Sequence, residues 1–476
     1  MDSFSQPTRS PWIKFLIKDS YSIDGRSLAS IGQLDVRVKN DPRTAPVLIG
    51  VKDPTPEKLK VVVRAFADRA FAMPLRPDEL EPFNRVALET WDREGDFVEA
   101  IRVSIKSMLT SPRFLWRFHS QRPREYQVAS DLARVLWLSV PDAELLRQAQ
   151  QGVWDESRLR EQVDRMLVDG RSQRWVHSFC QQWLNLRSFH QVSPSLKLYP
   201  HYDDLLDHYL PLETEAFIQH LLNEDLPVSN LVESEFSMLN QRLAQHYGVE
   251  GVSGQALRKV QWPEDSGRGG LLTMGSVLKV TTDGLQTSPI LRGAWISKNI
   301  VGNPLSPPPE SVKAIEPDTT GATSLRELIE KHQSDETCRS CHKSIDPYGF
   351  ALESFDATGQ WRNQYKVMVP HPGTFQYRPQ GYFKLGQSVD PSGILEELAF
   401  EGIGDLKKML VADHKKVSYN LMKQYFEFVT GQSPTLEQRY ELYQRIPDDR
   451  QAFGLKELVK RVLVFAWIDE NSLSDD

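Results

Sequence analysis

The stretch Cys338-Arg339-Ser340-Cys341-His342 is the most informative part of this sequence. Its C-x-x-C-H spacing is typical of covalent attachment of a c-type haem, in which two thiols bond to one porphyrin and the adjacent imidazole ligates the iron. Positions i, i+3 and i+4 share one face of a helix, so we expect Cys338, Cys341 and His342 to face one cofactor. With only 3 Cys and 11 His in 476 residues, chance would produce such a run in roughly one of a few thousand chains.

Three other interpretations of the paired cysteines stay open. A zinc site would need further ligands, and the chain has no second C-x-x-C and no H-x-x-x-H. A thiol redox pair is expected after a strand of a βαβ unit, whereas Ser324 and Glu327 form a capping box that predicts a helix upstream. A purely structural pair is the third alternative.

The segments around the motif mix turn signals with helical patterns. Downstream, Ile345–Phe350 and Phe355–Arg362 combine Pro, Gly and Asp with aromatic residues, and we expect turns that form the wall of a cofactor site. Residues 364–395 are expected to be loop. Residues 401–468 show apolar residues at helical spacing.

The predicted fold class is mainly α. We expect a multi-module helical protein with a short β-rich N-terminal segment and a loop-rich c-type haem module. The predicted divisions are a remnant of a β-rich module or linker (1–55), a helical module (57–120), a second helical module (126–250), a haem-binding module (260–365), a loop or insertion (366–400) and a C-terminal helical module (401–468).

Composition restricts the class of protein. Apolar residues make up 40% and charged residues 25%, as in an ordinary soluble domain. The net charge of −7 disfavours a nucleic-acid binder, and no run of 18 apolar residues predicts a transmembrane segment. The first residues do not form an export signal. Because haem is normally attached outside the cytoplasm, we expect the natural chain to begin further upstream.

Two further predictions concern residues 170–220. Trp175, Phe179 and Trp183 form an aromatic stripe at helical spacing, and we expect the adjacent Cys180 to be a buried and unreactive thiol. Glu213 and Glu215 are conceivable acid/base residues, but we expect both on a solvated helix face.

Four blocks of this sequence resemble the planctomycete-type multi-module cytochrome c proteins, whose helical modules are mostly domains of unknown function. Together they cover about residues 60 to 468. The matching stretches are Arg69-Ala70-Phe71 to Pro112-Arg113-Phe114-Leu115, Leu132 to Gly248, the block with Arg268-Gly269-Gly270, Thr287-Ser288-Pro289, Cys338 to His342 and Asp346-Pro347-Tyr348-Gly349-Phe350, and finally Val389-Asp390-Pro391-Ser392-Gly393 with the terminal helices.

The resemblance implies a c-type haem protein of the periplasm or cell envelope. Members of the family usually begin with an export signal and a further haem-bearing module, so we expect such N-terminal modules to be missing from this chain. The resemblance implies no particular reaction.

The leading hypothesis is electron transfer with an unidentified redox partner protein, and a non-catalytic role is favoured. Cys338 and Cys341 would hold haem c, and His342 would be the proximal iron ligand, with its other ring nitrogen oriented by a backbone carbonyl. Met274 is the first candidate for the distal ligand, followed by Met368 and His371. Arg292 and Arg362 are candidate partners of the haem propionates.

Two alternatives belong to other classes. One is a haem enzyme with an open sixth iron position. The other is an envelope scaffold, or a partner in polysaccharide utilisation, with an accessory haem. The sequence has no G-x-S-x-G, P-loop, H-E-x-x-H or dinucleotide fingerprint, so hydrolytic or nucleotide-dependent activities gain no support.

Overall fold

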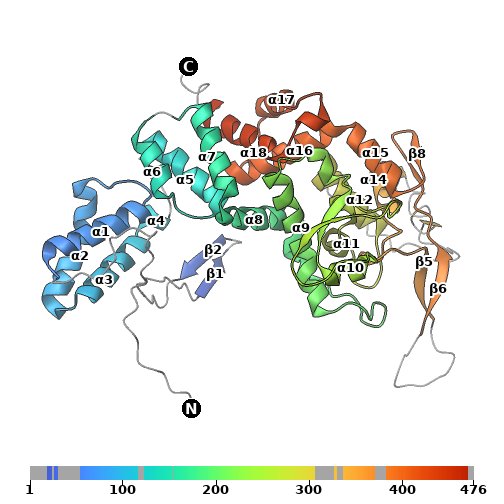
Figure 1. Ribbon diagram of the computed structural model, residues 1–476, viewed down its shortest axis with the longest axis horizontal. Helices are drawn as coiled ribbons and strands as arrows, with labels where there is room; N and C mark the ends of the chain where they lie inside the picture. The colour runs from blue at the N-terminus through green and yellow to red at the C-terminus, as the bar shows by residue number, and fades with distance from the viewer. Residues whose placement is uncertain are drawn as a thin grey trace, which may run out of the picture. The chain divides into compact units, whose positions relative to one another are not determined.

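The computed structural model describes residues 19–23, 26–30, 54–115, 123–152, 154–305, 326–327, 329, 336–369 and 382–469. These residues are mainly helical with a few short two-stranded antiparallel sheets, which confirms the predicted fold class. The chain divides into two compact units, Met1–Trp154 and Asp155–Asp476 (Figure 1). Within the described ranges, no helix combines the length and the apolar character that crossing a lipid bilayer requires.

The first unit consists of short helices whose apolar stripes pack together. They are α1 (Pro56–Ala70), α2 (Pro77–Glu94), α3 (Phe97–Leu109), α4 (Pro112–Leu115), α5 (Arg124–Trp137) and α6 (Ala143–Gln150), preceded by a hairpin of β1 (Asp19–Ile23) and β2 (Arg26–Ser30). Thr55 and Asp96 cap α1 and α3 by accepting hydrogen bonds from backbone N–H groups of the first turn. The core of α1–α3 includes Leu59, Phe71 and Met108.

The second unit holds the C-x-x-C-H stretch. Its first half contains α7 (Glu156–Val168), η3 (Gly170–Ser172), α8 (Gln173–Trp183), η4 (Leu186–Gln191), α9 (Asp204–Asn223), η5 (Val228–Leu231), β3 (Phe236–Leu239), α10 (Gln241–Tyr247) and β4 (Arg258–Gln261). After these come η6 (Leu271–Thr273), α11 (Gly275–Val280), α12 (Pro289–Ile296) and the π-helical turn η7 (Ser297–Val301).

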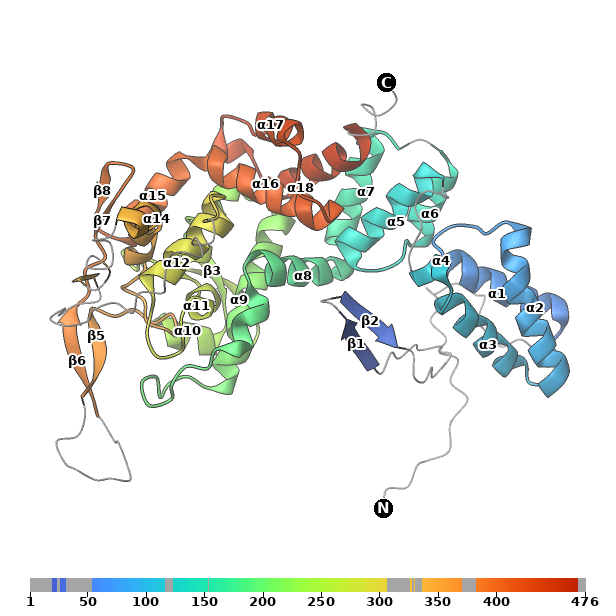
Figure 2. The ribbon, with the colours of Figure 1, turned by 180° about the vertical axis from the view of Figure 1, so that it is seen from behind.

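The second half of this unit begins with α14 (Glu336–Phe350). It continues with the paired strands β5 (Gln364–Val369) and β6 (Tyr382–Ser388), the paired strands β7 (Gly393–Leu395) and β8 (Leu398–Phe400), α15 (Ile403–Ala412), α16 (His414–Thr430), α17 (Leu436–Gln444), η8 (Arg450–Ala452), α18 (Leu455–Val464) and η9 (Phe465–Asp469). Seen from behind, α12 lies beside α14 (Figure 2).

Aromatic side chains connect α8 to α16 by ring contacts and to α12 and η7 by hydrogen bonds. Phe179 stacks on Trp175 and Trp183, and it makes an edge contact with Tyr425 of α16. The indole N–H of Trp183 donates to the Asn299 carbonyl (2.9 Å). A second indole, that of Trp295 in α12, donates to the carbonyl of Leu184 (3.1 Å), so these bonds fix α12 to the helical core.

Cys180 lies in this aromatic layer and is fully buried, which confirms that prediction. Burial raises the pKa of its thiol well above the usual range. We expect a thiol reagent to label Cys180 in the native protein only as fast as the structure opens. In the Cys338→Ala/Cys341→Ala variant, Cys180 is the only thiol, and its labelling can be followed before and after addition of urea. Equally fast labelling in both states would contradict the expectation.

Two segments differ from what the sequence indicated. Ile345–Phe350, expected to be a turn, forms the last part of α14, with Pro347 inside the helix. Residues 364–395, expected to be loop, contain the β5–β6 hairpin and β7. The β-prone residues Tyr365, Val367 and Phe383 occur in these two strands, and pairing overrides the loop-like composition nearby.

Candidate functional site

The C-x-x-C-H stretch lies on the helix α14. Cys338 and Cys341 are therefore one turn apart on a continuous helix, and His342 follows directly. The side chains of both cysteines lie outside the described part of the structure. The imidazole of His342 is described, and 13% of its side chain is exposed.

The ring of His342 is oriented by the carboxylate of Asp346, four residues later on the same helix. Nδ1 lies 2.9 Å from Oδ2 and 3.2 Å from Oδ1 of Asp346. An ionised carboxylate can only accept, so Nδ1 donates its proton, and the lone pair of the neutral ring is then on Nε2. The expected backbone carbonyl is thus replaced by a side chain, because the i, i+4 spacing brings Asp346 within reach.

Close packing of α12 against α14 holds the second half of the motif helix. A Cβ atom at Gly293 of α12 would collide with the Ile345 carbonyl oxygen, and one at Gly349 of α14 would collide with the carbonyl oxygen of Pro289. Only glycine permits this backbone approach. The part of α14 that carries Asp346 therefore has a fixed position against α12.

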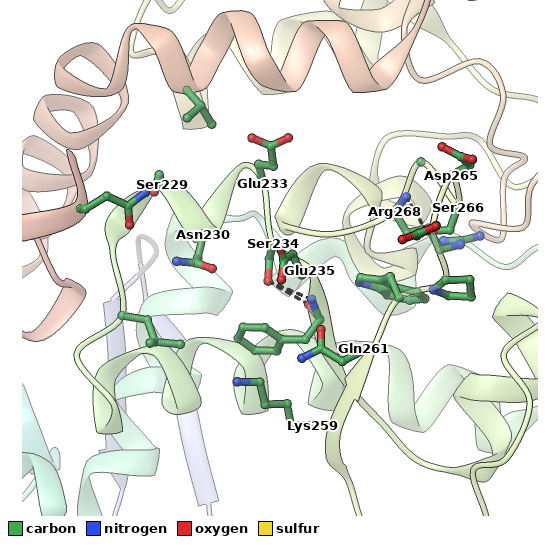
Figure 3. Close-up of a pocket in the computed structure, with 18 of the residues that line it drawn as sticks. Ser229, Asn230, Glu233, Ser234, Glu235, Lys259, Gln261, Asp265, Ser266 and Arg268 are labelled. Atoms are coloured by element: carbon green, nitrogen blue, oxygen red, sulfur yellow. Dashed lines mark hydrogen bonds between the residues drawn. The ribbon is translucent and has the colours of Figure 1, made fainter.

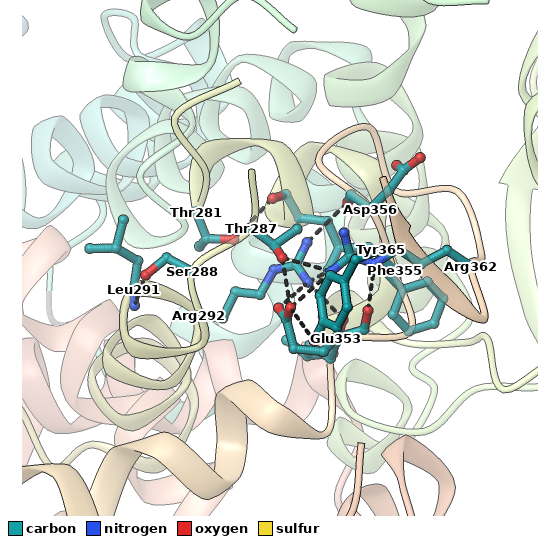
Figure 4. Close-up of polar contacts among 12 residues, drawn as sticks. Thr281, Thr287, Ser288, Leu291, Arg292, Glu353, Phe355, Asp356, Arg362 and Tyr365 are labelled. Atoms are coloured by element: carbon teal, nitrogen blue, oxygen red, sulfur yellow. Dashed lines mark hydrogen bonds and ion pairs between the residues drawn. The ribbon is translucent and has the colours of Figure 1, made fainter. Parts of the chain in front are cut away.

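A buried carboxylate, Glu353, lies just beyond the end of α14 and gathers several donors (Figure 4). Oε1 accepts from the Arg292 guanidinium (3.1 Å). Oε2 accepts from the Thr287 hydroxyl (2.7 Å), Arg362 (2.8 Å) and the Tyr365 hydroxyl (3.2 Å). These contacts join α12, α14 and β5, and we call Glu353, Thr287, Arg292, Arg362 and Tyr365 the Glu353 cluster.

The two arginines that the sequence offered for haem propionates both belong to the Glu353 cluster. Arg292 is fully buried and also donates to the carbonyl groups of Leu352 (2.7 Å), Phe355 (2.8 Å) and Asp356 (3.0 Å). Burial lowers the pKa of Arg292 to about 10. Arg362 additionally donates to the Glu353 carbonyl (2.8 Å). Contact with a propionate stays a prediction for both arginines.

The three distal-ligand candidates are placed differently. Met274 is buried, and its sulfur accepts a hydrogen bond from the hydroxyl of Thr214 (3.3 Å) on α9. Met368 belongs to strand β5, but its side chain is outside the described part. His371 also lies outside the described residues. Ligation by any of them stays a prediction.

Glu213 contradicts the expected solvated face, because it is fully buried on α9. Its carboxyl accepts from the hydroxyls of Ser237 (2.7 Å) and Tyr247 (2.6 Å). Burial raises its pKa to about 7. Glu215 is partly buried, and its carboxylate is 2.8 Å from Nδ1 of His177. The burial of Glu213 could have been predicted from the sequence. Glu213 follows Leu210 by three residues and precedes Phe217 by four, which places it within the apolar stripe of the helix.

We expect Glu213 to make stability depend on pH. The pKa of its carboxyl is higher in the folded chain than the ordinary value of 4.5, so its contribution is fully present below about pH 4.5 and is lost as the pH rises through about 7. A shift of this size corresponds to roughly 3 kcal/mol. Glu213→Gln should therefore become more stable relative to the wild type between pH 5 and pH 8, as measured by urea unfolding at both values.

Asp204→Asn in the first turn of the same helix is the matched control for Glu213→Gln. It should keep the pH dependence of the wild type, because Asp204 is exposed whereas Glu213 is fully buried. If Glu213→Gln and the wild type lose stability equally between the two pH values, Glu213 does not titrate in this range.

A polar cavity of about 750 Å³ lies elsewhere in this unit (Figure 3). Its wall includes Glu233, Glu235, Lys259 and Gln261, with Arg268 at one end. The guanidinium of Arg268 is buried over the rings of Tyr247 (4.3 Å) and Phe355 (5.0 Å). The residues that line this cavity come from segments far apart in the chain, so the cavity could not be predicted from the sequence.

Comparison with known families identifies three parts of the chain. Residues 58–118 match the family model PSD5, "Protein of unknown function (DUF1595)", residues 124–249 match PSD4, "Protein of unknown function (DUF1592)", and residues 268–365 match PSCyt3, "Protein of unknown function (DUF1588)". No curated protein and no solved structure matches the chain. Domains of these three kinds are typical of envelope proteins. The chain thus carries, in succession, three domains of the planctomycete-type multi-module cytochrome c proteins.

Proposed function

We propose that this protein is a c-type haem protein that transfers electrons in the periplasm or cell envelope. The observation that carries the proposal is a C-x-x-C-H run on one helix whose histidine has its Nδ1 held by a buried carboxylate. The matched domains support it, because they are associated with cytochrome c-type proteins.

The residue types of the C-x-x-C-H run support a covalently bound haem. The thiols of Cys338 and Cys341 would each add across one vinyl group. The S–H bond and the π bond of the vinyl group break, a C–S and a C–H bond form, no group leaves and no electrons are gained or lost. His342 would ligate the iron through Nε2 while Asp346 keeps Nδ1. When bound, the haem supplies one-electron chemistry.

The proposed role as an electron carrier requires a second axial ligand. Met274 is the candidate with a described side chain, whose sulfur accepts a hydrogen bond from Thr214. A haem without a sixth protein ligand would support the alternative of a haem enzyme. The alternative of a scaffold or polysaccharide-utilisation partner with an accessory haem gains no specific observation from the described residues.

The test of the proposal is a covalent haem stain. The full chain, exported in cells that have haem-maturation machinery, should run on a denaturing gel as a band with haem peroxidase activity. Cys338→Ala and Cys341→Ala should weaken or abolish the stain. Cys180→Ala, which removes the buried thiol, should leave it unchanged. An unstained band of correctly exported wild-type protein would refute the proposal.

Carbon monoxide separates electron transfer from the enzyme alternative. A six-coordinate low-spin ferrous haem that does not bind carbon monoxide fits a carrier, and a high-spin ferrous haem that binds it fits an open site. The visible spectrum of the reduced protein before and after addition of the gas distinguishes the two.

A further inference from the structure

We infer that Asp346 is a positioning residue that lowers the reduction potential of the haem through His342, an inference that rests on the proposed function. Asp346 contacts His342 through a hydrogen bond, 2.9 Å from Nδ1 to Oδ2. Its side chain is 1% exposed, so water contributes little screening to this pair. The arrangement is the carboxylate–histidine pair that tunes ligands in many metal sites.

The reduction potential is lowered because the group that accepts the hydrogen bond from His342 is a carboxylate. A carboxylate accepting the Nδ1 proton draws that proton away from the ring more strongly than a neutral carbonyl would. The imidazole then becomes a stronger electron donor at Nε2. A stronger donor stabilises the ferric iron more than the ferrous iron, since the ferric ion carries the higher charge. The haem therefore gives up its electron more readily than it would with a carbonyl-bonded histidine.

The position of Asp346 in the fold fixes this pair before any cofactor binds. Asp346 follows Ile345, whose carbonyl oxygen is in close contact with Gly293 of α12, and it precedes Gly349, which is packed against Pro289. The carboxylate therefore stands on the half of α14 that is closely packed against α12. The ring of His342 stands one turn earlier and is oriented from that half.

Other charges near this end of α14 are already compensated. Arg292 and Arg362 both pair with Glu353, in contacts of 3.1 and 2.8 Å. Asp356 is buried, and its carboxylate accepts from the backbone N–H groups of Thr358 (2.8 Å) and Gln360 (3.1 Å). Asp346 thus differs from Glu353 and Asp356, the other buried carboxylates among the described residues of this module, in contacting the proposed iron ligand.

The experiment compares the wild type with Asp346→Asn, which keeps the shape of the side chain and removes its charge. Both proteins should carry the same amount of covalent haem. At a fixed applied potential, the ferrous-to-ferric ratio should be about tenfold higher in the variant, which for one electron corresponds to a rise of about 59 mV in the midpoint potential. The g-values of the ferric electron paramagnetic resonance spectrum, which report the axial ligand field, should also change.

Asp356→Asn is the matched control, because it removes a buried carboxylate of the same module that makes no contact with His342. Its midpoint potential should stay close to that of the wild type. An unchanged potential in Asp346→Asn, an equal shift in Asp356→Asn, or loss of haem from Asp346→Asn alone would each overturn the inference. Absence of haem from the wild type would instead refute the proposed function.

Discussion

His342→Ala should retain some covalent haem and show a changed iron coordination and a raised midpoint potential. The two thioethers do not depend on the imidazole, so attachment is partly preserved. Once they form, His342 is held at the iron at high effective concentration, and it is the one histidine of the sequence that directly follows a cysteine. Its loss removes a basic ligand that favours ferric iron, and we expect a shift larger than the roughly 59 mV of a tenfold change.

The measurement for His342→Ala is the visible spectrum in both oxidation states together with a redox titration. His190→Ala is a suitable control, because His190 also pairs with a carboxylate, that of Asp207 at 2.9 Å, but lies outside the motif. The control should keep the spectrum and potential of the wild type. If His342→Ala does so too, His342 is not an axial ligand and the electron-transfer proposal loses its main support.

Glu353→Ala should lower the free energy of unfolding by about 3–5 kcal/mol, as is typical when one partner of a buried ion pair is removed. The substitution leaves Arg292 fully buried without its carboxylate. It also takes the acceptor from the Thr287 hydroxyl and from Arg362. Urea unfolding of the variant against the wild type measures the loss.

Lys408→Ala is the control for Glu353→Ala, because it breaks an exposed pair with Asp405 in the same unit (3.6 Å). Exposed pairs contribute about 0–1 kcal/mol, so this variant should unfold almost like the wild type. A loss below about 1 kcal/mol in Glu353→Ala would mean that solvent or neighbouring groups replace the missing carboxylate.

The helix that carries Cys338 to His342 was predictable because ligand spacing and helical period agree. The burial of Cys180 followed from its place in an aromatic stripe. Asp346 was missed because Pro347 and Gly349 indicate a turn when the sequence is considered alone. In the structure, Gly349 serves a contact between two helices, which local composition cannot reveal. This segment packs closely against α12, whose Gly293 approaches the carbonyl of Ile345, and such a long-range contact cannot be inferred from local composition.

The Glu353 cluster could not be assembled from the sequence. Thr287, Arg292, Arg362 and Tyr365 lie on both sides of Glu353 and as far as 66 residues from it. Each of these side chains is ordinary when considered alone. These side chains meet because α12 packs against α14 and because the β5–β6 hairpin begins nearby. Neither arrangement can be recognised from a short stretch of sequence.

The close glycine contacts between α12 and α14 have a consequence for protein engineering. A peptide that copied only α14 would contain the attachment run, but it would lack the partner surface that fixes Asp346. The smallest portable unit should therefore extend from Thr287 to Tyr365, so that it includes α12 and all five residues of the Glu353 cluster. Transplanting α14 alone into another scaffold would transfer the residues that attach the haem, but not the contacts that position Asp346 and thereby adjust the reduction potential.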